Sequence, residues 1–162
     1  MKRFLFTLSL FVFGPMTIWS QSITVCASGC NYTTIQAAID NANANDVIIV
    51  SPGTYTEDVT IDKTLTLEGP NQGTPGNSGG RNTEATINGL LRIKASSVIV
   101  DGFDILPPDA TSNATGEAVL ISNTPDNVEF RNNVVRDFGE SGVPPFEGLE
   151  AIVAFGGNAS DA

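Results

Sequence analysis

Two carboxylates stand close together in the motif Asp101-Gly102-Phe103-Asp104, and paired carboxylates commonly do general acid and base work. Strand alternation would turn Asp101 away from the core and leave Asp104 close by. We therefore take Asp101 and Asp104 as catalytic candidates. The alternative is structural, since Glu68 and Arg131 fill the same outward position in neighbouring repeats of the sequence, which indicates a solvated bend.

Cys26 and Cys30 are the two cysteines of the chain, which has no histidine. In an oxidising compartment we expect them to form a disulfide around the short loop between them. A zinc site is the alternative interpretation, but two thiols supply only half of a tetrahedral ligand set.

The N-terminus has the pattern of a signal peptide. Lys2 and Arg3 form a basic start, and an apolar stretch follows over residues 4–13. We expect cleavage near Ser20 or Gln21, so that residues 1–21 are the leader, whereas the alternative is a short buried helix. Because the apolar run falls short of the ~20 residues that cross a bilayer, we expect a secreted, extracellular or cell-surface chain without a membrane span after cleavage.

The expected mature chain is strongly acidic. Without Lys2 and Arg3 it has 6 basic and 18 acidic residues, a formal net charge of −12. This average field makes nucleic acid an unfavourable partner and would repel a polyanion unless local cations reversed it. Ca²⁺ is the counter-ion that we would expect in that case.

The first secondary-structure element that the sequence predicts in the mature chain is one helix, at about residues 34–44. Thr33 can cap it and Gln36 can reach back to complete a capping box. Apolar residues recur at helical spacing from Ile35 to Ala42, which predicts one buried stripe.

From Val47 to about residue 155, apolar residues tend to occur at every second position in short runs, which is typical of short strands. Two series of strands repeat with nearly constant spacing. The first series, with steps of 32, 28 and 33 residues, contains Val59–Ile61, Leu91–Ile93, Val119–Ile121 and Ile152–Ala154. The second, with steps of 33 and 30 residues, contains Leu65–Gly69, Val98–Gly102 and Val128–Asn132.

This period predicts an all-β fold, a right-handed parallel β-helix with a short N-terminal capping helix. Ile61, Ile93 and Ile121 should then lie above one another inside it. An antiparallel β-sandwich is the alternative. Because few residues follow the last strand, we expect residues 22–162 to be the N-terminal part of a longer β-helix domain, incomplete at its C-terminus.

Three longer polar loops, Pro70–Glu84, Leu106–Gly116 and Arg136–Gly148, follow the second series. If all three leave the same corner, they would wall a groove in which an extended sugar chain could lie. Phe138 and Phe146 could stack on sugars there, and Asp109 is a polar binding candidate in the same loops.

Three segments carry a resemblance to a known family. Residues 32–39 (YTTIQAAI), 46–57 (DVIIVSPGTYTE) and 59–69 (VTIDKTLTLEG) closely resemble the opening of pectin lyase-like proteins. This opening is shared by pectinesterases and by bacterial β-helix repeat proteins, so it implies a fold more than an activity. It implies structural roles in the first coil for Gly53, Tyr55 and the stretch from Lys63 to Gly69.

The resemblance also implies which chemistry to look for. Nothing here matches the catalytic motif of pectinesterases. Polysaccharide lyases of the superfamily hold Ca²⁺ with acidic side chains and use Arg or Lys as the base. Asp101, Asp104, Glu129 and Asp137 are the candidate Ca²⁺ ligands and Arg131 the candidate base, whereas the alternative is an ordinary set of ion pairs between repeats.

Two functions of different classes follow. The first is a non-enzymatic secreted or surface protein that adheres or binds polysaccharide, because no catalytic motif is found in this chain. The second is a polysaccharide-active enzyme, lyase or esterase, whose catalytic residues lie beyond residue 162. The sequence leaves the oligomeric state open.

Overall fold

The computed structural model describes residues 22–106, 118–121, 125–136 and 154–155. These residues form mostly β structure, with parallel sheets and one short helix. All pairings between the named strands are parallel. The antiparallel sandwich is therefore wrong for the described part of the chain.

The strands form three sheets, which we name A, B and C. Sheet A contains β1 (Ser22–Val25), β2 (Val47–Val50), β5 (Thr66–Glu68), β8 (Ile99–Asp101) and β11 (Glu129–Arg131), in that spatial order. Sheet B contains β3 (Gly53–Tyr55), β6 (Ala85–Asn88), β9 (Asp104–Leu106) and β12 (Val134–Val135). Sheet C contains β4 (Val59–Ile61), β7 (Leu91–Ile93), β10 (Val119–Ile121) and β13 (Ala154–Phe155).

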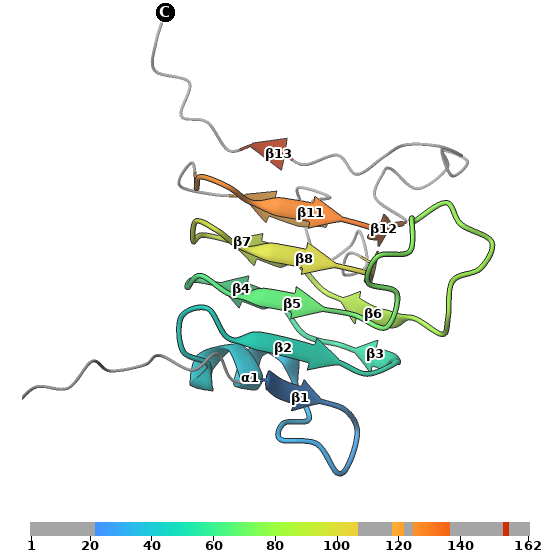
Figure 1. Ribbon diagram of the computed structural model, residues 1–162, viewed down its shortest axis with the longest axis horizontal. Helices are drawn as coiled ribbons and strands as arrows, with labels where there is room; N and C mark the ends of the chain where they lie inside the picture. The colour runs from blue at the N-terminus through green and yellow to red at the C-terminus, as the bar shows by residue number, and fades with distance from the viewer. Residues whose placement is uncertain (1–21, 107–117, 122–124, 137–153, 156–162) are drawn as a thin grey trace, which may run out of the picture.

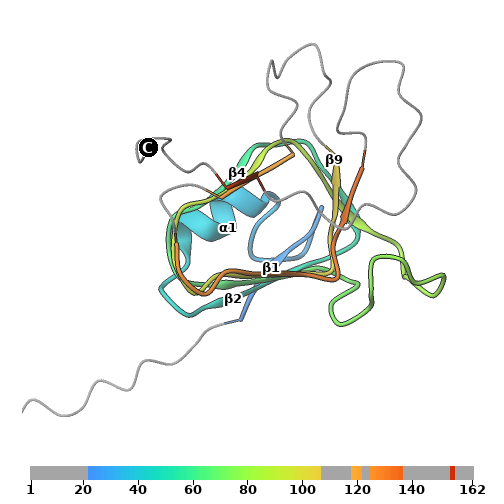
Figure 2. The same ribbon diagram turned by 90° about the horizontal axis from the view of Figure 1, so that it is seen from above.

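From β2 onward the chain visits sheets A, B and C in turn, and we call each such passage a repeat. Figure 1 shows the strands of successive repeats stacked in one direction. Seen from above, in Figure 2, the three sheets surround one interior. Each strand therefore pairs with the equivalent strand of the next repeat.

The register confirms most of the predicted spacing. Ile61 pairs with Ile93, and Ile93 with Ile121, as the first series requires. The last step is wrong by one residue, because Leu120 pairs with Ala154, 34 residues later, so that Phe155 lies opposite Ile121. Alternation could not choose between the two registers, since both sets of alternate residues in this segment are apolar.

Sheet B is the element that the sequence reasoning missed. Its strands are only two to four residues long, and β3, β6 and β9 contain Gly, Thr, Asn or Asp, so that β12 alone of the described sheet B strands is wholly apolar. The loop Pro70–Glu84 connects sheet A to sheet B, whereas residues 107–117 and 137–153 connect sheet B to sheet C. The prediction that all three loops leave one corner is therefore wrong.

The core consists of inward side chains that repeat in register. Ile61 and Ile93 are fully buried and Ile121 is 5% exposed. Leu67 and Val100 are fully buried in the equivalent ladder of sheet A. Each such side chain contributes ~1.5–3 kcal/mol before conformational entropy is subtracted, so the stacked ladders are the main source of stability.

The helix α1 (Ile35–Asn41) covers the end of the sheets that contains β1, and it buries Ile35, Ala38 and Ile39. It is shorter than predicted and its N-cap is Thr34, not Thr33. The two carboxylate oxygens of Glu57 accept hydrogen bonds from the first backbone N–H groups of the helix, those of Ile35 and Gln36, at 2.8 and 3.0 Å.

Gln36 does not complete the predicted capping box. Its side chain accepts from the N–H of Thr60 at 2.7 Å and donates to the carbonyl of Thr60 at 3.3 Å. At the other end of the helix, the Lys63 ammonium donates to the carbonyls of Asp40 and Ala42. Residues of the family-like opening therefore attach the helix to the sheets.

Candidate functional site

Asp101 lies on the outer face of sheet A, but it is buried. Its side chain is 8% exposed, so the predicted solvated bend is wrong for this residue. One carboxylate oxygen accepts from the Asn132 side chain at 2.8 Å and from the N–H of Gly73 at 3.0 Å. The other accepts from Nε of Arg131 at 2.9 Å. Asp101 thus joins the next repeat to the loop that follows β5.

The contacts of Asp101 decide its charge. Burial alone would raise its pKa, but hydrogen bonds from Asn132, Gly73 and Arg131 outweigh burial and hold the pKa of Asp101 below its ordinary value. The hydrogen bond to Asp101 is also the main reason why the pKa of Arg131 is raised. Asp101 is therefore a firmly ionised structural acceptor, which is unsuited to donating a proton near neutral pH.

Asp104 begins β9 on the outer face of sheet B and is fully buried. It accepts from the hydroxyl of Thr86 at 3.0 Å and from Nε of Arg136 at 2.7 Å, and Nη2 of Arg136 also contacts it. Asp101 and Asp104 are thus held by different arginines on different sheets. The two carboxylates predicted as a pair from the sequence therefore each have their own arginine partner.

The candidate ligand Glu129 takes part in an ion pair with Arg131. Glu129 accepts from Nη1 of Arg131 at 2.6 Å, and both side chains are about half exposed. No group of three or more acidic, cysteine or histidine side chains that could hold a metal ion occurs among the described residues. Asp137, Asp109, Phe138 and Phe146 lie outside the described residues, as does the predicted leader, residues 1–21.

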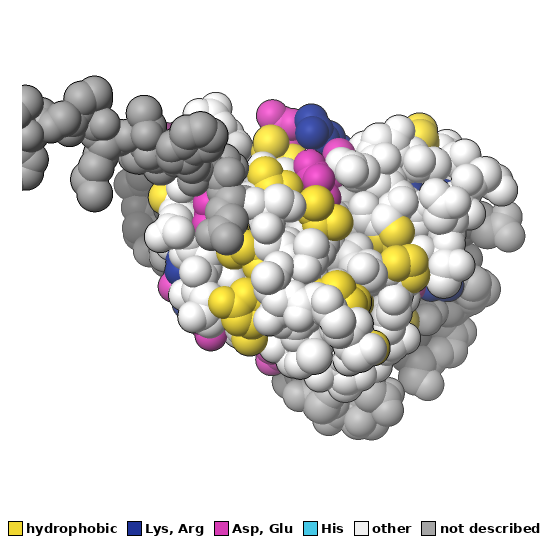
Figure 3. All heavy atoms as spheres, turned by 60° about the horizontal axis from the view of Figure 1, so that its bottom comes forward, with side chains coloured by type: hydrophobic (Ala, Val, Ile, Leu, Met, Phe, Trp, Pro, Cys, Tyr) yellow, Lys and Arg dark blue, Asp and Glu magenta, His cyan; other side chains and the backbone are white. Residues whose placement is uncertain are grey.

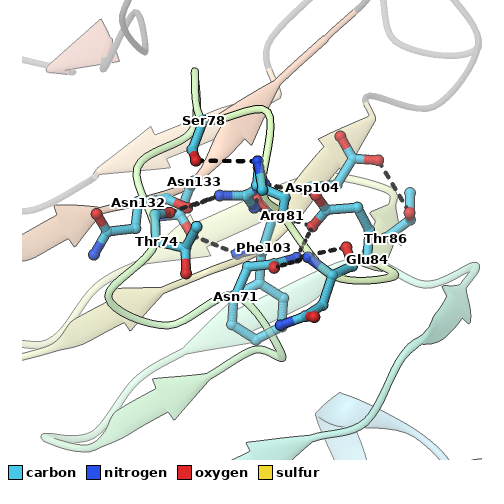
Figure 4. Close-up of polar contacts among 12 residues, drawn as sticks. Asn71, Thr74, Ser78, Arg81, Glu84, Thr86, Phe103, Asp104, Asn132 and Asn133 are labelled. Atoms are coloured by element: carbon cyan, nitrogen blue, oxygen red, sulfur yellow. Dashed lines mark hydrogen bonds and ion pairs between the residues drawn. The ribbon is translucent and has the colours of Figure 1, made fainter.

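The loop between β5 and β6 holds the most connected polar side chain of the described structure, that of Arg81 (Figure 4). Its guanidinium donates to both carboxylate oxygens of Glu84, at 2.6 and 3.0 Å. Nη1 donates to the carbonyls of Thr74 and Asn132 at 2.8 and 2.9 Å, and Nη2 donates to the carbonyl of Phe103 at 3.4 Å. All five N–H groups are therefore used, and the side chain is only 9% exposed.

Other residues fix the same loop. Asn71 is fully buried, and its side chain accepts from the N–H of Asn82 and donates to Glu84. Gly102 allows the backbones to touch, since a Cβ there would lie 2.1 Å from the backbone nitrogen of Gln72. The loop is thereby attached to the two repeats that follow it and forms a fixed border between sheets A and B.

Beside this border, the outer face of sheet B carries a row of small polar groups. Thr54, Thr86 and Asp104 are in register on successive strands, and Asn88 follows Thr86 on the same face. Thr54 is exposed, and Thr86 and Asn88 are half-buried. We call Thr54, Thr86 and Asn88 the sheet B face. Hydroxyl and amide groups at strand spacing suit hydrogen bonding to an extended polar ligand.

The predicted disulfide is confirmed, with Cys26 and Cys30 joined and their Cα atoms 5.6 Å apart. Both cysteines are therefore occupied, which excludes the zinc alternative for this oxidised form. Within the described residues, no helix has the length and apolar character that crossing a bilayer requires.

Comparisons with known proteins give one informative similarity. No protein-family model matches the chain, and no solved structure matches it. The chain is similar to a protein named cell surface glycoprotein from Methanothermus fervidus, with 36% identity over a stretch that covers 46% of this chain. That stretch spans only 12% of the glycoprotein.

Proposed function

We propose that this chain belongs to a right-handed parallel β-helix of the pectin lyase-like superfamily. Three observations on the described residues support the proposal: their strand pairings are all parallel, the chain visits the sheets in the order A, B, C from β2 onward, and the inward ladders repeat in register. The helix contacts of Gln36 and Lys63 agree with a capping role for the family-like opening.

We further propose that the chain works outside the cell as a non-enzymatic part of a surface protein. The basic and apolar start of the sequence and the disulfide support export. The name of the similar glycoprotein supports a surface location. Against catalysis, the buried carboxylates Asp101 and Asp104 are each neutralised by an arginine.

The proposed activity is polysaccharide binding on the sheet B face. The observation that carries it is the group of outward polar side chains there: Thr54 and Thr86 pair in register, and Asn88 follows Thr86 on the same face. The Arg81 loop supports the proposal because it fixes one border of this face before any ligand arrives. A fixed site loses little conformational entropy when it binds an extended chain.

A glycan array followed by titration calorimetry with the best ligand tests this activity. The double substitution Thr54→Ala with Asn88→Ala should weaken binding by about tenfold or more, since each lost hydrogen bond contributes roughly 1 kcal/mol. Thr60→Ala removes an outward threonine of sheet C and serves as the matched control, which should bind like the parent. No glycan binding, or equal weakening by the control, would reject the sheet B face.

The enzymatic alternative is tested separately with pectate and Ca²⁺, by following the absorbance of unsaturated product. We expect no turnover by this chain. Turnover that disappears in Arg131→Ala would overturn the non-enzymatic proposal and would make Arg131 the base.

A further inference from the structure

The loop between β1 and α1 contains the tripeptide Asn31-Tyr32-Thr33. It fits the acceptor pattern of N-linked glycans, which is Asn-x-Ser or Asn-x-Thr with any residue but proline in the middle. Asn113 and Asn158 begin the same pattern outside the described residues. So short a pattern also arises by chance, and the surroundings of Asn31 in the fold therefore have to decide whether a glycan fits there.

The side chain of Asn31 is held through its oxygen. Asn31 is exposed, and its Oδ1 accepts from the N–H of Thr24 at 2.9 Å and from the Thr24 hydroxyl at 2.8 Å. A backbone N–H can only donate, so the atom that faces it must be the oxygen of the amide. The amide nitrogen, Nδ2, makes no hydrogen bond to the described residues. A glycan is attached to Nδ2, so both bonds of Oδ1 to Thr24 can persist in the glycosylated chain.

The middle residue of the pattern is fixed, and the residues on either side of it are exposed. Tyr32 donates its N–H to the carbonyl of Thr24 and accepts from the N–H of Cys26, both at 3.1 Å, and its side chain packs against the core. Because alternate residues of an extended segment point to opposite sides, Asn31 and Thr33 are turned away from the core, and both are exposed. The acceptor asparagine and the threonine of the pattern are therefore on the surface together.

The space beside Asn31 is open. The loop that precedes it contains the small residues Ala27, Ser28 and Gly29, which are all exposed, and a Cβ added to Gly29 would meet nothing within 4 Å. This loop lies below β1 in Figure 1, beyond the outermost strand of sheet A. Figure 3 brings this end forward and shows hydrophobic side chains as small separate groups among polar and backbone atoms. A large hydrated glycan therefore has room at this end and covers no broad apolar face.

We propose that Asn31 is the acceptor of an N-linked glycan, which is added to the chain during export. The donor is a sugar chain carried on a lipid phosphate. A bond forms between Nδ2 and the anomeric carbon of the sugar, and the bond from that carbon to the phosphate oxygen of the carrier breaks. Nδ2 gives up one proton, and the phosphate keeps the bonding electron pair. The inference rests on the proposed export but not on polysaccharide binding by the sheet B face.

Secretion of the full chain, with its own leader, from yeast cells that add N-linked glycans tests the proposal. Trypsin should release a fragment that ends at Lys63, which contains Asn31 and neither of the other two acceptor patterns. Mass spectrometry of this fragment, before and after treatment with peptide N-glycosidase, should show a glycan on Asn31 in most molecules. Thr33→Ala should lower the glycosylated fraction by roughly tenfold or more, whereas Thr33→Ser, which keeps the pattern, should retain most of it.

The outcomes separate this inference from the proposed function. A secreted chain whose Asn31 fragment is unmodified, or a glycan that persists in Thr33→Ala, would overturn the inference alone. A chain that is not secreted would overturn the proposed export, and the inference with it.

Hydrogen exchange tests whether the folded chain accommodates the glycan. If Oδ1 of Asn31 still accepts from Thr24, the Thr24 amide should exchange at the same rate in the glycosylated parent and in unglycosylated Thr33→Ala. Asn31→Ala removes the acceptor and should speed exchange of this amide by roughly tenfold or more. Exchange that is as fast in the glycosylated parent as in Asn31→Ala would contradict the geometry proposed for Asn31.

Discussion

Replacing Arg81 with methionine should strongly destabilise the chain. Methionine keeps an unbranched apolar side chain but removes five N–H donors. The carbonyls of Thr74, Phe103 and Asn132 would then lose donors, and the Glu84 carboxylate would lose its cation. Because Arg81 is only 9% exposed, water cannot replace these bonds while the loop stays closed.

The size of the effect follows from these contacts. Hydrogen bonds to a charged group contribute ~1.5–3 kcal/mol each, and breaking a buried ion pair costs ~3–5 kcal/mol. The losses do not add fully, because the loop can open and hydrate Glu84 and the freed carbonyls. We therefore expect the free energy of unfolding to fall by about 3–5 kcal/mol in Arg81→Met.

Urea denaturation followed by circular dichroism measures this change. Arg92→Met is the matched control, since Arg92 lies on the outer face of sheet C and makes no described ion pair, and it should change stability by less than ~0.5 kcal/mol. Cleavage after Glu84 by a glutamate-specific protease should also become faster in Arg81→Met. Equal stability of the two variants, with unchanged cleavage, would refute the idea that Arg81 clamps the loop.

Three further predictions use the same denaturation assay. Ile93→Ala should lower the free energy of unfolding by ~2–5 kcal/mol, because it leaves a cavity among fully buried side chains. Ile49→Ala, at a side chain that is 40% exposed, should lower it by less than ~1 kcal/mol. Similar losses in the two variants would contradict the inward position of Ile93. Gly102→Ala should lower the free energy of unfolding by more than ~1 kcal/mol, because φ of Gly102 is +85° and a Cβ would collide with the loop backbone. Gly79→Ala, with open space around it, should be nearly neutral. A neutral Gly102→Ala would contradict the close approach of the Gly102 and Gln72 backbones. The pKa of Asp101 is lower in the folded than in the unfolded chain, so its ionised form stabilises the fold above about pH 4, and this stabilisation is lost as pH falls through the folded pKa. The difference in free energy of unfolding between the parent and Asp101→Asn should therefore shrink between pH 6 and pH 2. A constant difference would contradict this linkage.

Much of the fold could be predicted from the sequence because the signals are local. Val59–Ile61 and Leu91–Ile93 alternate β-branched or apolar residues with polar ones, and their 32-residue spacing is the register that the structure shows. The disulfide followed from two cysteines with a short loop between them. Sheet B was missed because Gly53–Tyr55 and its partner strands have no apolar run to mark them.

The candidate site was predicted less well, because the properties of its residues depend on distant partners. Asp101 and Asp104 were chosen as a pair from their nearness in the chain. Their actual partners are arginines 30 and 32 residues away: Arg131 lies on the next strand of sheet A, and Arg136 directly follows the next strand of sheet B. Nearness in the chain therefore did not reveal the distant partner that each carboxylate has in the folded structure.

The sequence by itself determined the strands of sheets A and C, their approximate repeat period and their inward residues, since alternation and β propensity act over a few residues. Only the tertiary structure decided where the loop after β5 lies and which carboxylates it buries. Arg81 reaches a carbonyl 51 residues away, and the N–H of Gly73 reaches Asp101 over 28 residues. Such hydrogen bonds form only after the repeats have stacked, so they cannot be predicted from the local sequence.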